Sequence, residues 1–173
     1  NICTAQALLA IISSFYAIYH GSSGLTEIAK RICSLRSCLE SGLSELGFEI
    51  AVGSRFDGFD IYSKYSEKIH NEALKNGYNF RILPMGSSIE DSTGFGITLD
   101  ELSDEGEITQ ILNFIAHAIG QKEAFNPIVL NEEFLLDGIP LRNESWMQQD
   151  IFLNYQSETD LMRYIFRLSE KDF

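Results

Sequence analysis

The first twenty residues, Asn1 to His20, limit what this chain can fold into more than any other stretch. Apolar side chains recur there at the spacing of one helical face and spread over most of the circumference. A helix that is apolar nearly all round must be buried on more than one side. The run is too short to cross a bilayer, and no basic region precedes it as in a signal peptide. We expect a packed helix that joins this domain to something larger outside these residues. The main stripe consists of Ala5, Leu8, Leu9, Ile12, Phe15, Tyr16 and Tyr19.

Composition indicates one globular domain with an acidic surface. The chain has 173 residues, of which 45% are hydrophobic and 22% charged, and its net charge is −12. That charge would repel phosphate backbones and anionic lipid, so we expect neither a nucleic-acid nor a membrane partner. Three cysteines, Cys3, Cys33 and Cys38, are an odd number, which favours reduced thiols in a cytosol-like compartment. Because Asn1 stands where an initiator Met would be, we expect an excised fragment or a processed domain.

Two helices are predicted at the start of the chain. The first runs from about Thr4, whose hydroxyl can cap it, to His20, with Gly21 as a left-handed residue after its end. A short turn, 22–24, then leads to a helix from about Leu25 to Leu46, which Gly47 ends. Helices joined by so short a turn should pack antiparallel. The second helix has one apolar face, and its charged residues, including Arg36 and Glu40, lie mostly elsewhere; the face consists of Ile28, Ile32, Leu35, Leu39, Leu43 and Leu46.

After Gly47 the apolar period changes from 3.6 to 2, which is typical of strands. The expected element order is α-α-β-β-α-β-β-α, with the first two and the last two strands paired as antiparallel neighbours. This predicts an α+β fold with helices packed on a small, mainly antiparallel sheet. The strands are expected at 48–52, 59–63, 78–83 and 94–99, with Tyr78, Phe80 and Ile82 on one face of the third. The helices between and after them are expected at 66–76, which Gly77 ends, and at 105–119, which Asp100 or Ser103 leads into and Gly120 ends. The side chains expected to face inward are Ile69, Ala73 and Leu74 on the first of these helices and Ile108, Ile111, Leu112, Ile115 and Ala116 on the second.

The remaining residues are expected to form an arm and a last helix. Residues 121–156 show no stable period, yet they carry too many apolar side chains for a solvated linker. We expect an extended arm that lies along a surface of the same molecule or of a partner. The capping box Ser157-x-x-Asp160 starts a helix with a buried stripe of Leu161, Tyr164, Ile165 and Leu168. The organisation is thus an α+β domain at 1–120, the arm at 121–156 and a terminal helix at 157–173.

No group of residues forms a self-sufficient active site. The three histidines, His20, His70 and His117, lack a second metal ligand at i+3 or i+4, which favours capping or surface roles. Serines 22–23 and 87–88 fall in turns, and the carboxylate pairs 90–91 and 132–133 are expected to face water. None of the six lysines, Lys30, Lys64, Lys68, Lys75, Lys122 and Lys171, resembles a buried Schiff-base amine. We therefore predict no catalytic, cofactor-binding or metal-binding residue in this chain.

Several segments nevertheless resemble one family in order along the chain. Asn1 to Ala10, N-I-C-T-A-Q-A-L-L-A, looks like the glycine dehydrogenase (decarboxylating) family, the P-protein of the glycine cleavage system. Gly77 to Arg81 is similar to its G-I-N-L-R, and Gly96 to Glu101 to its G-I-S-L-D-E. Ser157 to Tyr164 resembles its S-E-T-E-M-L-R-Y. Shorter matches are Tyr16–Gly21, Gly24–Ala29, Phe56–Asp57, Arg167–Leu168 and Lys171–Asp172.

The resemblance implies a middle slice of a longer, internally duplicated chain. The slice would be the small domain closing the first half, similar to the small C-terminal domain of fold-type-I pyridoxal-phosphate enzymes, plus the arm and helix leading to the second half. The parent would decarboxylate glycine and pass the aminomethyl group to the lipoyl group of the H-protein, in a bacterial cytoplasm or, in a eukaryote, the mitochondrial matrix. The lysine that holds pyridoxal phosphate would lie downstream of Phe173.

The chain departs from the family pattern in the arm, so no catalytic residue is carried over. The family tends to have T-H-P near Gln148 and histidines just before S-E-T, where this chain has Tyr155 and Gln156. The expected partners are the remainder of the P-protein, its dimer mate and the H-protein, and the expected role of this piece is structural support of the half-to-half interface. The alternative is a non-catalytic α+β module that senses an amino acid, because fold pattern alone says little about function.

Overall fold

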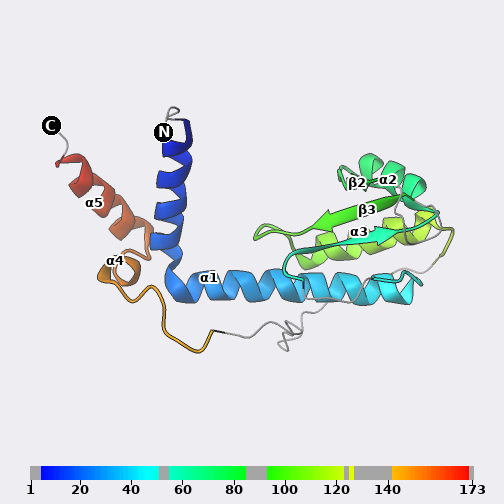
Figure 1. The fold of residues 1–173 in the computed structure, drawn as a ribbon, viewed down its shortest axis with the longest axis horizontal. Coiled ribbons are helices and arrows are strands. Elements are labelled where there is room, and N and C mark those ends of the chain that lie inside the picture. The colour runs from blue at the N-terminus through cyan, green and yellow to red at the C-terminus, as the bar shows by residue number, and fades with distance from the viewer. Residues whose placement is uncertain (1–4, 51–54, 85–92, 123–124, 127–141, 172–173) are drawn as a thin grey trace. The chain divides into compact units, whose positions relative to one another are not determined.

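The computed structural model of the protein describes residues 5–50, 55–84, 93–122, 125–126 and 142–171 (Figure 1). The chain divides into two compact units, which we treat separately. One unit combines Asn1–Ile28 with Pro140–Phe173, and the other is Ala29–Ile139. The described elements are α1 (Ala5–Glu45), β1 (Gly58–Tyr62), α2 (Ser66–Lys75), β2 (Arg81–Leu83), β3 (Gly94–Thr98), α3 (Glu105–Ala118), α4 (Asp150–Leu153) and α5 (Glu158–Ser169).

The two helices predicted at the start are one element with a kink. Gly21 has φ 60° and ψ −172°, a conformation for glycine only, so its predicted positive φ is confirmed. The three-residue turn is wrong, because residues 22–24 are helical and α1 resumes at once. The predicted antiparallel packing stays a prediction, because the two helices concerned fall mainly in different units. A side chain at Gly21 would also collide with Gln156, and its Cβ would lie 2.8 Å from the carbonyl oxygen of Phe152.

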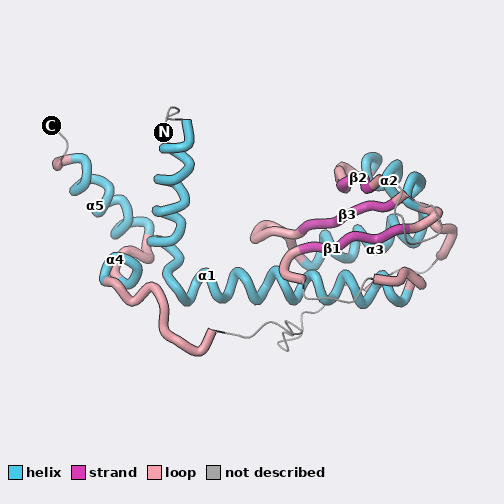
Figure 2. The backbone as a smooth tube through the Cα atoms, in the orientation of Figure 1, coloured by secondary structure: helices cyan, strands magenta, loops and turns pink. Residues whose placement is uncertain are grey.

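The sheet of the 29–139 unit has three antiparallel strands in the order β1-β3-β2 (Figure 2). Three of the four predicted strands correspond to it, and the predicted pairing of the last two is confirmed. The first predicted strand is wrong for 48–50, which are irregular, while 51–52 lie outside the described residues. As a result β1 pairs with β3 instead of with a strand before it. The α+β class with a small antiparallel sheet is confirmed.

Helices α2 and α3 follow the sequence closely. Gly77 and Gly120, which follow them, both have φ above 80°, as expected of residues that end a helix. All five side chains predicted to face inward from α3 are buried. Its cap is Asp104, whose side chain accepts from the Glu107 N–H, and not Asp100 or Ser103 as predicted. On α2, Ile69 and Ala73 are buried as expected, but Leu74 is exposed.

The core of this unit is built on aromatic contacts around the central strand. Phe95 of β3 is 1% exposed, and its ring lies 5.9 Å from that of Phe80 and 6.3 Å from that of Phe48. Phe80 in turn lies 5.7 Å from Phe114 of α3. These contacts bind the sheet to α3 and to the segment that follows α1. In the predicted strand 78–83, Phe80 is inside as expected, whereas Ile82 is exposed and Leu83 is buried instead, because β2 begins only at Arg81.

The second half of α1 packs against α3 inside this unit. Its predicted apolar face is buried from Ile32 to Leu46. Gly42 lies directly over Leu112, and a Cβ added at Gly42 would come within 2.7 Å of the Leu112 Cδ2 atom. Arg31 and Glu105 form a bidentate ion pair at the edge of the same contact, with N···O distances of 3.2 and 2.9 Å. The missing side chain at Gly42 therefore sets how closely the two helices approach.

In the other unit, the regular elements among the described residues are all helices, and 142–149 and 154–157 are irregular. The Ser157 hydroxyl caps α5 by accepting from the Asp160 N–H, which confirms Ser157 as the cap, and it donates to the Asp160 carboxylate. No residue of α5 is fully buried, so the predicted stripe is only half-buried, and Leu168 is exposed. Within the predicted arm, Asp150–Leu153 forms one helical turn, where an extended chain was expected. Much of the rest of that arm, 127–141, lies outside the described residues.

Gly42→Ala should lower the free energy of unfolding by about 1–2 kcal/mol. Alanine gains about 1 kcal/mol in helix propensity, but overpacking a filled core costs about 1–3 kcal/mol, and Leu112 is fully buried and has no room to move. Urea unfolding of the 173-residue chain measures the difference. Ser41→Ala, at the exposed neighbouring position, is the matched control and should change stability by less than about 0.5 kcal/mol. A stabilised Gly42→Ala variant would show that α1 and α3 do not touch there.

Candidate functional site

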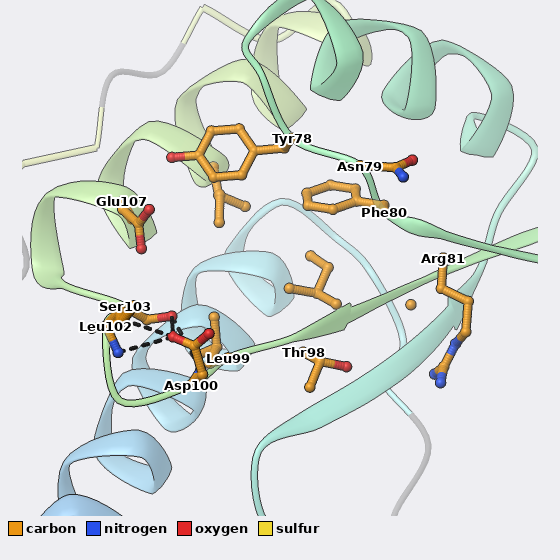
Figure 3. Close-up of a pocket in the computed structure, with 13 residues that line it drawn as sticks. Tyr78, Asn79, Phe80, Arg81, Thr98, Leu99, Asp100, Leu102, Ser103 and Glu107 are labelled. Atoms are coloured by element: carbon orange, nitrogen blue, oxygen red, sulfur yellow. Dashed lines mark hydrogen bonds between the residues drawn. The ribbon is translucent and has the colours of Figure 1, made fainter. Parts of the chain in front are cut away.

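A pocket of about 400 Å³ opens at the end of the sheet, where β3 leads into α3 (Figure 3). Its inner wall is apolar and includes Phe80, Leu99 and Ile111, all buried. Figure 3 shows Tyr78 and Phe80 on one side of the hollow and Asp100 on the other, with Glu107 at its edge. The sequence analysis did not find this pocket, because its walls come from three elements that only the sheet order brings together. The remaining lining residues are Asn79, Arg81, Gly96, Ile97, Thr98, Leu102 and Ser103.

The turn between β3 and α3 is held by the Asp100 side chain. Its Oδ1 accepts from the Leu102 N–H at 2.9 Å, from the Ser103 N–H at 3.2 Å and from the Ser103 hydroxyl at 3.3 Å. The Ser103 hydroxyl also accepts from the Asp100 N–H at 3.2 Å. These groups stabilise the turn, as Asp and Ser commonly do. Because the Ser103 hydroxyl donates to a carboxylate that already accepts two N–H groups, this pair is a structural clamp and not a nucleophile with its base.

Tyr78 forms one wall of the pocket and is partly buried. Its hydroxyl donates to Gln110 Oε1 at 3.2 Å, and its ring lies 5.6 Å from that of Phe114. Burial raises the pKa of the Tyr78 phenol, and the nearby carboxylates Glu107 and Asp104 raise it further. The phenol is thus held neutral at ordinary pH, and the electrostatic environment of the pocket is negative.

Arg81 is the cation among the lining residues, and it is already paired. Its guanidinium forms an ion pair with Asp60 of β1, across Gly96 of the central strand. An α-amino acid needs a cation for its carboxylate as well as an anion for its ammonium group. The pocket supplies carboxylates, but its arginine is committed to Asp60. The geometry therefore gives no support to the amino-acid-sensing alternative.

Of the three histidines that were predicted to cap a helix or to lie on the surface, one is exposed and two are half-buried. His117 of α3 is exposed, and its Nδ1 lies 3.8 Å from the Glu72 carboxylate. His70 of α2 is half-buried, and its Nδ1 has no hydrogen-bond partner among the described residues. His20 contacts the rings of Tyr16 and Tyr19 beside the kink of α1. Among the residues that the structure describes, no three His, Cys, Asp or Glu side chains are grouped to hold a metal ion.

The remaining candidates add no reactive group. All six lysines are exposed, so none has the enclosed, desolvated environment of a Schiff-base amine. Serines 87–88 and the carboxylate pairs 90–91 and 132–133 lie outside the described residues. Ser22 and Ser23 are part of α1, and the Ser22 carbonyl accepts from the Thr26 hydroxyl. The prediction that this chain supplies no catalytic, cofactor-binding or metal-binding residue stays a prediction.

A charged network that begins off the predicted apolar face of α1 has one buried member, Arg36, beside the half-buried Glu40 and Arg55. Arg36 is only 6% exposed and donates to Glu40, which also pairs with Arg55 Nε at 2.9 Å. Beside it, the buried Cys33 thiol donates to the Phe56 carbonyl at 3.2 Å, and burial raises its pKa although Arg36 acts in the other direction. Cys33 and Cys38 are both free thiols, as predicted. A helical wheel could not reveal this network, because its other half comes from the segment after α1.

The exposed apolar side chains concentrate in the helical unit. On the first half of α1, Leu8 and Leu9 are 64% and 65% exposed, and Ile11 and Ile12 are more than half exposed. This helix was predicted to be buried on more than one side, but the rest of the chain leaves these side chains exposed. None of the described helices combines the length and hydropathy needed to span a membrane.

Helix α5 has two apolar sides. Leu161, Tyr164 and Ile165 are half-buried, whereas Met162 and Phe166 are each 64% exposed. A soluble helix normally has one apolar face, turned toward its own core. A second face that protrudes into solvent is typical of a helix that packs between two structures.

The two units of this chain differ in how far they cover their own apolar residues. One unit has a closed α+β core, and the other presents helices whose apolar faces are exposed. Exposed apolar helix faces of this kind are typical of a surface that packs against other polypeptide. A model of the glycine cleavage system P-protein family matches residues 1–115. The chain belongs to this family.

Curated relatives agree with that assignment over the whole chain. Glycine dehydrogenase (decarboxylating) of Prochlorococcus marinus (strain NATL1A) is 47% identical over 173 residues, and that of Parasynechococcus marenigrum (strain WH8102) is 44% identical over 172. The protein of the same name from Psychromonas ingrahamii (strain DSM 17664 / CCUG 51855 / 37) is 38% identical over 177 residues. The alignments cover 99–100% of this chain but only 18% of each relative. The chain thus corresponds to less than a fifth of these proteins.

Tyr78→Phe should reduce the loss of stability that the chain shows at alkaline pH. A phenol whose pKa is raised on folding contributes stability that is present below its ordinary pKa of about 10 and is lost as pH rises through the raised value. At neutral pH the variant should cost only about 0.5–1 kcal/mol, because it loses the partly exposed hydrogen bond to Gln110. Urea unfolding between pH 7 and about 11.5 measures both effects. If wild type and variant lose stability in parallel above pH 10, the burial of this phenol is not what raises its pKa.

Proposed function

We propose that this chain is a segment of a glycine dehydrogenase (decarboxylating), the P-protein of the glycine cleavage system. The complete protein would decarboxylate glycine and transfer the aminomethyl group to the lipoyl group of the H-protein, with pyridoxal phosphate as cofactor. The observation that carries the proposal is 47% identity over all 173 residues to a protein of that name. We place this activity in a bacterial cytoplasm, in line with the free thiols and the bacterial relatives.

The residues of this chain do not fit the proposed cofactor. Pyridoxal phosphate is held through a lysine Schiff base, and every lysine here is exposed. We therefore assign the cofactor, the substrate and all chemical steps to the rest of the protein. The role of this segment is structural: it supports the interface between the two halves of the enzyme and that with its dimer mate.

The uncovered helix faces support this structural role. Leu8, Leu9, Met162 and Phe166 are each about two-thirds exposed, and all belong to the same unit. Covering one such side chain contributes about 1.5–3 kcal/mol, so contact with the remainder of the protein would bury a favourable surface. The closed core of the other unit explains how the segment can keep its shape while its helices serve as an interface.

The complete protein, purified with lipoylated H-protein, should exchange labelled bicarbonate with the carboxyl group of glycine. The 173-residue chain alone should show neither this exchange nor the pyridoxal absorbance at roughly 420 nm. Failure of the complete protein in the exchange assay would contradict the proposed activity. A pyridoxal chromophore in the isolated chain would instead contradict the structural role.

A second experiment tests the interface without relying on activity. Leu9→Asp and Phe166→Asp should each change the stability of the isolated chain by less than about 0.5 kcal/mol, because both positions are exposed there. In the complete protein the same changes would bury a carboxylate and should cost more than about 2 kcal/mol. The matched control is Leu74→Asp on α2, an exposed position of the other unit, which should be neutral in both proteins. Equal effects in the two proteins would remove the case for an interface.

A further inference from the structure

The turn between β3 and α3 presents a leucine that its own unit does not use. Leu102 is 84% exposed, although it stands beside a pocket with an apolar wall. The neighbouring Leu99 is buried in that wall, so apolar side chains within three residues have opposite environments. A leucine this exposed contributes nothing to the folding of the unit. It is available for a partner, and the pocket beside it gives a partner a place to insert a side chain.

The turn is rigid enough to hold Leu102 in one place. The carboxylate of Asp100 accepts three hydrogen bonds from Leu102 and Ser103, and Asp104 caps the helix that follows. A preformed surface loses little conformational entropy when a partner binds, which favours affinity. The exposure of Leu102 is therefore a fixed feature of the turn.

The charge at the mouth of the pocket is negative. Asp100 and Glu107 line it, and five of the eight residues from Asp100 to Glu107 are carboxylates. Two nearby cations are already paired, Arg81 with Asp60 and Arg31 with Glu105. The hydrogen bond from Arg31 lowers the pKa of the Glu105 carboxyl group. The pocket would thus attract a cation. A second copy of this chain, with its net charge of −12, is a poor occupant.

The shape of the pocket suits a long, cationic side chain. The rings of Tyr78 and Phe80 line one wall and the Leu99 side chain lies opposite, while the two carboxylates stand at the opening (Figure 3). Lysine and arginine bury their methylene stems along apolar surfaces and keep the charged head at the edge. An aromatic face also attracts a cation placed over it. The stem of a basic side chain can therefore contact the apolar wall of this pocket while its charged head contacts the carboxylates at the opening.

We propose that this pocket and Leu102 form a docking site for a segment of a partner protein in which a lysine or arginine stands next to an apolar residue. The basic side chain enters the pocket toward Asp100 and Glu107, and the apolar neighbour covers Leu102. A small polyamine would satisfy the two carboxylates but would leave Leu102 uncovered, which is why a protein segment is the better occupant. This site is separate from the helix faces of the other unit and does not depend on the proposed enzymatic activity.

The test uses the complete protein and a photoreactive peptide, acetyl-Gly-Lys-photoleucine-Lys-Gly-amide. After irradiation, mass spectrometry maps the cross-links, which should concentrate in 78–81 and 98–107. Glu107→Lys and Leu102→Asp should each reduce the yield at these positions by about tenfold, equivalent to about 1.4 kcal/mol of binding free energy. The yield should also fall with added salt, because the carboxylates attract the lysines through solvent.

Matched variants on α2 separate the site from general attraction to an acidic protein. Glu67→Lys and Leu74→Asp change the same residue types at exposed positions of the same unit and should leave the yield unchanged. Circular dichroism of all four variants establishes that each is folded. Cross-links spread over the surface, or reduced equally by the control variants, would overturn the proposal. Competition by spermidine as effective as that by the unlabelled peptide would also overturn it and identify a polyamine site.

Discussion

The packing of Phe95 is the interaction on which the α+β unit depends. This side chain belongs to the middle strand and is almost completely buried, with Phe48 and Phe80 against it and Phe114 one ring further on. It joins the sheet to α3 and to the segment after α1, although these parts are far apart in the sequence. The same cluster builds the wall of the pocket, since Phe80 faces it. A single apolar cluster therefore contributes both to the stability of this unit and to the shape of the pocket beside Leu102.

Apolar surface is more stable when it is removed from water, and the two units differ in how they meet this requirement. The α+β unit covers its apolar residues with its own sheet and helices. The helical unit leaves Leu8, Leu9, Met162 and Phe166 in solvent. Since the chain spans only 18% of the relatives that it matches, the polypeptide that could cover these faces is large. The proposed role as an interface segment of a glycine dehydrogenase follows from this imbalance together with the family membership.

Local signals in the sequence predicted the elements well, and long-range contacts accounted for the errors. Helices α2, α3 and α5 follow from their apolar periods, and Gly77, Gly120 and Ser157 mark ends that the structure confirms. The alternation at 48–52 looked like that of a strand, but Phe48 is buried as an aromatic contact of Phe95 and 48–50 pair with no strand. Arg36 lay off the apolar face of its helix, yet it is buried, because the Glu40 carboxylate pairs with it. Arg55, from the segment after α1, binds the same carboxylate.

The sequence by itself determined the family, the α+β class and most helix boundaries, because each of these depends on residues that are close together in the chain. Only the tertiary structure decided the strand order β1-β3-β2, the continuation of α1 through Gly21 and the pocket beside Leu102. These features depend on contacts between segments that are far apart in the sequence. Periodicity can show that a side chain avoids water, but it cannot show which neighbour covers it.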